Sequence, residues 1–136
     1  MKTLVLALCV MPLLGSAAFA GDATKGESDF KRCKACHSIT AADGTVIQKG
    51  GKTGPDLGGV IGRQVGSVED FRYGDSIVAA GETGAVWDEE SFAAYIQDPK
   101  AWLIEVTGDK GAKTKMTYKH KKGAEDMAAY FASLNN

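Results

Sequence analysis

The sequence has no apolar run long enough to cross a membrane. Its longest, residues 4–14, falls short of the about 20 residues that a spanning helix needs. Lys2 precedes this run, and an Ala-Phe-Ala sequence at 18–20 has the small-x-small pattern of a signal-peptidase site. We therefore expect residues 1–20 to be a cleaved signal peptide and residues 21–136 to be an exported, soluble domain. An uncleaved membrane anchor is the alternative.

Cysteine is scarce, with three in 136 residues. Cys9 lies within the predicted signal peptide, and a lipoprotein is excluded because Leu8 precedes it where a small residue is needed. Export leads to an oxidising compartment, in which the remaining Cys33 and Cys36 should be paired or occupied. Two cysteines so close together exclude a disulfide that closes a long loop. They form either a small redox disulfide or the attachment point of a cofactor.

Neither charge is in excess. The 16 basic and 17 acidic residues give a net charge of −1, which offers no argument for nucleic-acid binding. The distribution is uneven, however. Residues 110–122 contain six lysines and no acid, whereas residues 82–109 contain seven acids and Lys100 alone. The molecule should therefore be electrically asymmetric.

Strand patterns, internal repeats and interdomain linkers are also absent, and the length predicts one domain. Helical periodicity and end signals predict an all-α domain with short helices at 22–36, 68–79, 88–97, 99–105 and 124–134. Asp22 can cap the first helix, and Gly81 should stop the second. Residues 38–66 form a loop that is long for a compact domain unless something packs inside it. A buried haem would supply the core that these short helices lack.

Residues 33–37 read Cys-Lys-Ala-Cys-His, the C-x-x-C-H sequence of haem c attachment. Two thiols on about one helical turn can each form a thioether with a haem vinyl group, and His37 then supplies a nitrogen ligand to the iron. The alternative is a thioredoxin-like dithiol followed by a chance histidine, but that fold needs strands around the motif. Cys33, Cys36 and His37 therefore predict one covalently attached haem c.

The second axial ligand decides between electron transfer and ligand binding. Only Met116 and Met127 remain after removal of the signal peptide, and Met127 lies on the apolar stripe of the last predicted helix. Met116 lies in a polar, lysine-rich loop where packing does not explain it, so we predict that it binds the iron. His120 is the competing ligand, although a histidine in a basic run is expected to be solvent-exposed. A His/Met pair implies a relatively high reduction potential.

Further segments fall in one order along nearly all of the expected mature chain. They are Gly26, Phe30, the motif at 33–37, Lys-Thr-Gly-Pro-Asp-Leu at 52–57, Gly62-Arg63, Phe-Arg-Tyr at 71–73, Trp-Asp-Glu-Glu at 87–90, Tyr95, Thr-Lys-Met at 114–116 and Glu-Asp-Met-Ala-Ala-Tyr at 125–130. With these segments the chain resembles the cytochromes c2, bacterial relatives of mitochondrial cytochrome c. The resemblance implies the class I cytochrome c fold, in which short helices and long loops surround one haem.

The resemblance also implies roles for side chains around the haem. The Pro55 carbonyl would accept a hydrogen bond from His37, which fixes the ring and raises its donor strength. The remaining matches are Arg63, Tyr73 and Trp87 at positions that hydrogen-bond a haem propionate, and Tyr95 and Thr114 at positions around the methionine sulfur. Plain core packing is the alternative for the two aromatics Trp87 and Tyr95, and an exposed loop charge is the alternative for Arg63.

Three features depart from the pattern of this family. Asp56 stands where many members have Asn, and its charge would lower the reduction potential. Tyr118 stands where an exposed Phe is common, which makes contact with partners more polar. Residues 105–112 form a longer segment than in the mitochondrial proteins, which leaves the shape of the surface near the haem edge open.

The expected function is that of a monomeric periplasmic electron carrier rather than an enzyme. The resemblance implies the cytochrome bc1 complex as donor, and a photosynthetic reaction centre or terminal oxidase as acceptor. Lysines near Met116 would steer the protein to acidic partners through salt-sensitive encounters, namely Lys113, Lys115, Lys119, Lys121 and Lys122, with Lys34, Lys49 and Lys52 as further candidates. The rivals are a haem peroxidase or small-ligand binder with an open iron position, and a haem subunit of a larger complex.

Overall fold

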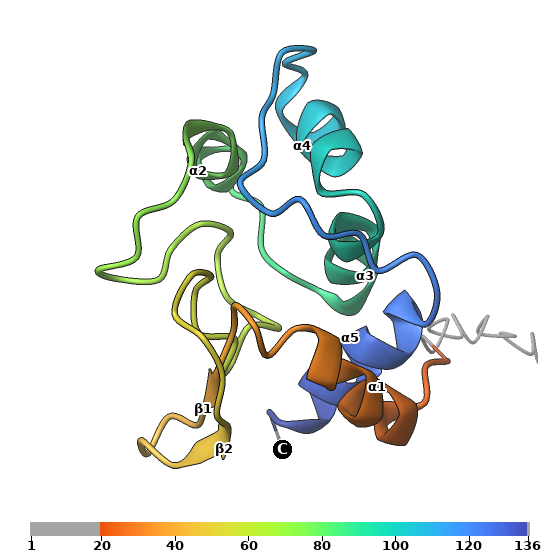
Figure 1. Ribbon diagram of the computed structural model, residues 1–136. Helices are drawn as coiled ribbons and strands as arrows, with labels where there is room; N and C mark the ends of the chain where they lie inside the picture. The colour runs from red at the N-terminus through yellow and green to blue at the C-terminus, as the bar shows by residue number, and fades with distance from the viewer. Residues whose placement is uncertain (1–19, 136) are drawn as a thin grey trace, which may run out of the picture.

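The computed structural model describes residues 20–135, so the predicted signal peptide lies outside the described residues except for Ala20. Five α-helices, one short 3-10 helix and one two-stranded sheet are present in this range (Figure 1). In chain order they are α1 (Ala23–Asp29), η1 (Phe30–Arg32), β1 (Ile39–Thr40), β2 (Val46–Gln48), α2 (Asp75–Glu82), α3 (Glu89–Gln97), α4 (Pro99–Thr107) and α5 (Ala124–Ser133). The predicted class of short helices joined by long loops is confirmed.

Figure 1 shows how the helices are arranged. α1 crosses α5 at one end of the molecule, α3 lies beside α5, and α2 packs with α4 at the other end. The segment 108–123 returns from α4 past α3 to α5, and the His120 N–H donates to the Ile96 carbonyl of α3 at 2.7 Å. This return segment contains Met116. Within residues 20–135, no helix is both long enough and apolar enough to span a bilayer.

The crossing of α1 and α5 depends on a glycine. Gly26 is buried, and a Cβ at this position would collide with the Asp126 backbone carbonyl and the Tyr130 side chain. One turn later, Phe30 packs against Tyr130 and Phe131, with ring centroids 6.4 and 5.9 Å apart. Gly26 and Phe30 therefore bring the first and last helices together.

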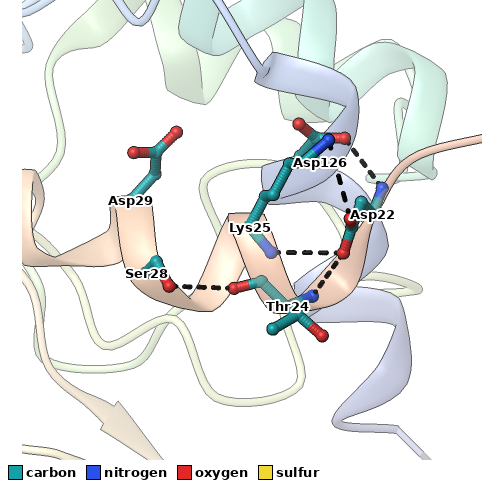
Figure 2. Close-up of a pocket in the computed structure, with 6 residues that line it drawn as sticks. All are labelled: Asp22, Thr24, Lys25, Ser28, Asp29 and Asp126. Atoms are coloured by element: carbon teal, nitrogen blue, oxygen red, sulfur yellow. Dashed lines mark hydrogen bonds and ion pairs between the residues drawn. The ribbon is translucent and has the colours of Figure 1, made fainter.

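A small polar hollow lies at the surface where α1 begins beside α5 (Figure 2). Its lining residues are Asp22, Thr24, Lys25, Ser28, Asp29 and Asp126. The Asp22 carboxylate caps α1, as predicted, by accepting from the Thr24 N–H at 3.0 Å, and the Asp22 N–H donates to the Asp126 carboxylate at 2.7 Å. These bonds tie the first turn of α1 to α5. Figure 2 shows Asp29 standing apart from them.

Local capping sets the starts of α3 and α4 where the sequence predicts them. The Asp88 carboxylate accepts from the Ser91 N–H at 2.7 Å, and the Ser91 hydroxyl accepts from the Asp88 N–H at 3.0 Å, which forms a reciprocal capping box. Asp98 caps α4, which has Pro99 in its first turn. The helix runs two residues beyond its predicted end and stops at Gly108, whose φ of 71° is the left-handed conformation that glycine favours.

The helix predicted at 68–79 is wrong in position. α2 begins seven residues later, because the preceding segment forms a turn in which the Tyr73 hydroxyl accepts from the Val68 N–H at 3.3 Å. Gly81 does not stop the helix but lies buried within it, since a Cβ there would collide with the Val65 carbonyl. The position of α2 therefore depends on a tertiary contact that helical periodicity does not contain.

Strands β1 and β2 pair antiparallel, with Ile39 opposite Gln48, and the sequence does not predict them. Each has only two or three residues, too few to show an alternating pattern. Ile39 is fully buried, whereas Val46 is 58% exposed. The pair thus anchors one part of the predicted 38–66 loop to the core.

Candidate functional site

A cavity of about 570 Å³ is lined by segments from nearly the whole described chain, and its size falls in the range of about 300–1,000 Å³ typical of cofactor pockets. All ten residues predicted for the site line it: Cys33, Cys36, His37, Pro55, Arg63, Tyr73, Trp87, Tyr95, Thr114 and Met116. Apolar side chains such as Leu57, Val60, Ile77 and Leu103 form part of the wall. Two thiols, an imidazole and a thioether therefore meet at one partly apolar site.

The two thiols lie on a tight turn after η1 rather than on the continuous helix predicted to residue 36. The N–H groups of Cys36 and His37 both donate to the Cys33 carbonyl, at 3.1 and 2.9 Å. Both thiols are free, and burial raises the pKa of the Cys33 thiol to about 11, with a further contribution from the Asp29 charge. A redox-active dithiol needs a lowered pKa on its attacking thiol, and the raised pKa of Cys33 argues against that role for this thiol in the thioredoxin-like alternative.

His37 is held in one orientation by the following loop. Its Nδ1 lies 2.7 Å from the Pro55 carbonyl oxygen, and because that oxygen can only accept, Nδ1 carries the hydrogen. Burial lowers the pKa of His37, and the Pro55 hydrogen bond and the Asp56 charge oppose this shift. A neutral ring with its hydrogen on Nδ1 leaves the Nε2 lone pair available for a metal ion. A side chain at Gly54 would collide with this ring, so only glycine fits there.

Met116 is positioned by hydrogen bonds within its own loop. The Thr114 hydroxyl accepts from the Met116 N–H at 3.0 Å and donates to the Met116 carbonyl at 3.1 Å. Burial raises the pKa of Tyr95, and a hydrogen bond with the Thr114 side chain opposes the shift. The Lys115 ammonium donates to the carbonyl of Tyr73 at 3.3 Å, which ties the loop to the segment before α2. The Met116 side chain is half-buried against the core.

Trp87 and Tyr95 serve the core and the site together. Trp87 is 6% exposed, and its ring lies 5.0 Å from that of Tyr95 and 4.9 Å from that of Trp102. Both residues also line the cavity. Packing in the core and contact with a bound cofactor are therefore compatible roles for Trp87 and Tyr95. Trp102 completes the aromatic cluster, and no motif marks it in the sequence.

Arg63 is half-buried and not the exposed loop charge considered as an alternative. Its guanidinium donates to the carbonyls of Gly58 and Asp56, both at 3.0 Å. Burial lowers the pKa of Arg63, while the neighbouring Tyr73 opposes the shift. These two bonds leave further N–H donors on the guanidinium. Arg63 thus fixes the loop next to His37 and keeps donors for a carboxylate at the cavity wall.

The prediction that His120 is solvent-exposed is wrong. Its side chain is 2% exposed and lines the cavity. The loop turns it inward because its N–H bonds to the Ile96 carbonyl, while its neighbours Lys119 and Lys121 remain exposed. One inward position in a basic run has no periodicity to reveal it in the sequence.

Known proteins share the fold of this chain. No protein-family model matches the chain. The chain is 57% identical over 122 residues to cytochrome c2 of Rhodobacter capsulatus, covering 90% of this chain and 89% of that protein. It is 53% identical over 121 residues to cytochrome c-550 of Paracoccus versutus, covering 88% and 79%. The solved structure of the Rhodobacter cytochrome c2 matches with a TM-score of 0.83 at 56% identity, covering 85% of this chain and 100% of that chain.

The chain belongs to the class I cytochrome c family. Cytochromes c of this family carry one covalently bound haem c and are electron carriers. The residues around the cavity fit that group. The two free thiols have the spacing that two vinyl groups require, and the neutral His37 imidazole is oriented by its hydrogen bond to the Pro55 carbonyl. The Met116 thioether lines the same cavity.

Proposed function

We propose that this class I cytochrome c is a periplasmic, monomeric electron shuttle with a low-spin haem c, and not an enzyme. Cys33 and Cys36 would hold the haem through thioethers, and His37 and Met116 would be the axial ligands. When bound, the haem iron supplies a one-electron couple. The observation that carries the proposal is the cavity that gathers these four side chains, with Met116 fixed by Thr114.

The surrounding side chains would orient the group and exclude water. The Pro55 carbonyl holds the His37 ring, and Thr114 with Tyr95 holds the Met116 loop. Arg63 and Tyr73 have donors left for a propionate, since the Tyr73 hydroxyl accepts from the Val68 N–H and can still donate its own hydrogen. The Trp87 indole would be a third donor. A site in which both axial positions are filled reorganises little during electron transfer.

Exposed lysines would steer the protein to acidic surfaces on its partners. Of the five lysines near Met116, Lys115 is bound to backbone carbonyls, and Lys119 pairs with Asp98 at 2.7 Å. Lys113, Lys121 and Lys122 are exposed, and no ion pair is found for them within residues 20–135, so they would supply most of the docking charge. The partners we propose are the cytochrome bc1 complex as donor and a photosynthetic reaction centre or terminal oxidase as acceptor.

The axial ligand set is tested by the absorption spectrum of the ferric protein. A methionine–iron charge-transfer band should be present, and Met116→Ala should abolish it because the thioether is removed. Met127→Leu is the matched control, since Met127 is a core residue of α5 that is 1% exposed. Peroxidase activity or binding of small ligands by the unsubstituted protein, without this band, would favour the open-iron alternative and overturn the shuttle.

A further inference from the structure

One lysine of the basic segment does not present a free charge. The Lys119 ammonium lies 2.7 Å from Asp98 Oδ2, and the two side chains are 43% and 41% exposed. Lys119 belongs to the basic region 110–122 and Asp98 to the acidic region 82–109, so this ion pair joins the two oppositely charged regions. Two charges in contact with water contribute little to stability. A second carboxylate can therefore replace Asp98 as the partner of Lys119 at little cost in stability.

The Asp98 carboxylate has two separate contacts. Its Oδ1 accepts from the Ala101 N–H at 3.1 Å and so caps α4, whereas its Oδ2 accepts from the Lys119 ammonium. The Lys119 hydrogen bond, and after it the hydrogen bond from Ala101, lowers the pKa of Asp98, so the carboxylate is ionised at neutral pH. The cap holds this carboxylate in place whether or not Lys119 binds it. Asp98 therefore presents a fixed negative charge to a flexible lysine side chain.

The backbone beside Lys119 is held without the ion pair. The N–H of the next residue, His120, donates to the Ile96 carbonyl at 2.7 Å, and the His120 side chain is 2% exposed. Tyr118 and His120 both line the haem cavity, whereas Lys119 between them is exposed. The ammonium can therefore leave Asp98 by rotation of its own side chain, while the wall of the cavity keeps its position.

Unpaired lysines follow directly in the chain. Lys121 and Lys122 are exposed, and no ion pair is found for them within the range 20–135. A partner whose carboxylates reach Lys121 also comes within reach of the long Lys119 side chain, two residues away. Lys119 then has a choice between Asp98 and a carboxylate of the partner. Such an exchange changes the affinity only by the difference between the two ion pairs.

We propose that Asp98 is an internal competitor for Lys119: the lysine binds Asp98 in the free protein and a carboxylate of the redox partner in the complex. The attraction that Lys119 contributes to docking is reduced by the ion pair that it gives up. The complex therefore dissociates sooner than it would with a free lysine at this position, which suits a carrier that leaves one partner to reach the next. The inference rests on the lysine docking proposed above and adds an acidic residue that limits its strength.

A double-mutant cycle on Asp98 and Lys119 is the direct test. Asp98→Asn keeps the cap on α4, since the single amide oxygen can accept from the Ala101 N–H, but it removes the charge that holds Lys119. The measured quantity is the apparent second-order rate constant, at low ionic strength, for reduction of the ferric holoprotein by purified cytochrome bc1 complex supplied with quinol.

The effect of Asp98→Asn should depend on the lysine. It should raise the rate constant about 3- to 5-fold when Lys119 is present, and less than about 2-fold in the Lys119→Gln background. Equal factors in the two backgrounds would overturn the proposal, since Asp98 would then act through net charge alone. Glu105→Gln is the matched control, because it makes the same change of charge at an exposed position of α4. A rise in this control as large as that of Asp98→Asn would also overturn the proposal.

Two further measurements separate the inference from its neighbours. If the ion pair were only an anchor of the loop, Asp98→Asn would weaken the methionine–iron charge-transfer band of the ferric protein. We expect an unchanged band, and its loss would overturn the proposal. Lys121→Gln tests docking itself and should slow the reaction about 2-fold or more. If it does not, or if the bc1 complex does not reduce the protein, lysine docking and this inference fall together, whereas slowing by Lys121→Gln with equal factors in the cycle would overturn this inference alone.

Discussion

At the scale of single residues, Asp56 shows how a charge next to the iron ligand is held. Its carboxylate accepts from the N–H groups of Thr40 and Gly58, at 2.9 and 2.8 Å, and from the Thr40 hydroxyl at 2.6 Å. The negative charge of Asp56 also reaches His37, where it opposes the fall in pKa that burial causes. The charge therefore acts on the site while its hydrogen bonds anchor β1 to the loop.

Replacing this carboxylate by an amide tests its effect on the redox couple. Asp56→Asn should raise the midpoint potential by roughly 10–40 mV, because a negative charge near the iron stabilises the ferric state. An Asn oxygen can still accept from both backbone N–H groups, so the loop should keep its shape. A redox titration measures the change, with Asp43→Asn in the exposed hairpin turn as the control of equal charge. An unchanged midpoint in Asp56→Asn would discard the idea.

At the scale of elements, the α1–α5 crossing should be the most sensitive helix contact. Gly26→Ala gains helix propensity, but the added methyl group collides with the Asp126 carbonyl. We expect the free energy of unfolding to fall by about 2 kcal/mol, measured by urea unfolding of the holoprotein. Glu27→Ala, on the exposed side of the same helix, should leave it nearly unchanged. Equal stability of the two variants would show that α1 and α5 can move apart enough to accommodate the methyl group without a loss in the free energy of unfolding.

The same elements show which parts of the fold the sequence could predict. α3, α4 and α5 begin within two residues of their predicted starts, and for α3 and α4 the reason is that the Asp88 and Asp98 caps act on their own chain neighbours. α2 begins late because the segment before it forms a turn in which Val68 bonds to Tyr73, and α1 ends at Asp29, where the chain continues as the 3-10 helix η1. Neither change leaves a signal in the helical periodicity, so the pattern does not predict them.

For the molecule as a whole, the site was more predictable than the fold. The C-x-x-C-H motif and the ordered resemblance named ten residues that line one cavity, although their roles as ligands and donors stay predictions. The burial of His120 was not predicted because a single inward side chain in a basic run produces no periodic pattern. Trp102 was not predicted because no motif contains it. Chemistry that depends on residue type can be predicted from the sequence. Burial that depends on one backbone hydrogen bond, such as that from His120 to Ile96, cannot.

The charge asymmetry of the whole molecule gives the last prediction. Lys113→Gln, Lys121→Gln and Lys122→Gln together should slow electron transfer with a membrane partner by about 5- to 20-fold at low ionic strength, because steering is lost, and the difference should shrink as salt rises. Stopped-flow kinetics across a salt series measures it.

A second triple variant separates steering from total charge. Gln at Lys25, Lys31 and Lys100 removes the same three charges from exposed positions on α1, η1 and α4. If the rate depends on where the lysines lie, this variant should react much as the unsubstituted protein does. Equal slowing in the two triple variants would mean that only net charge matters, and the docking surface near Met116 would have to be given up.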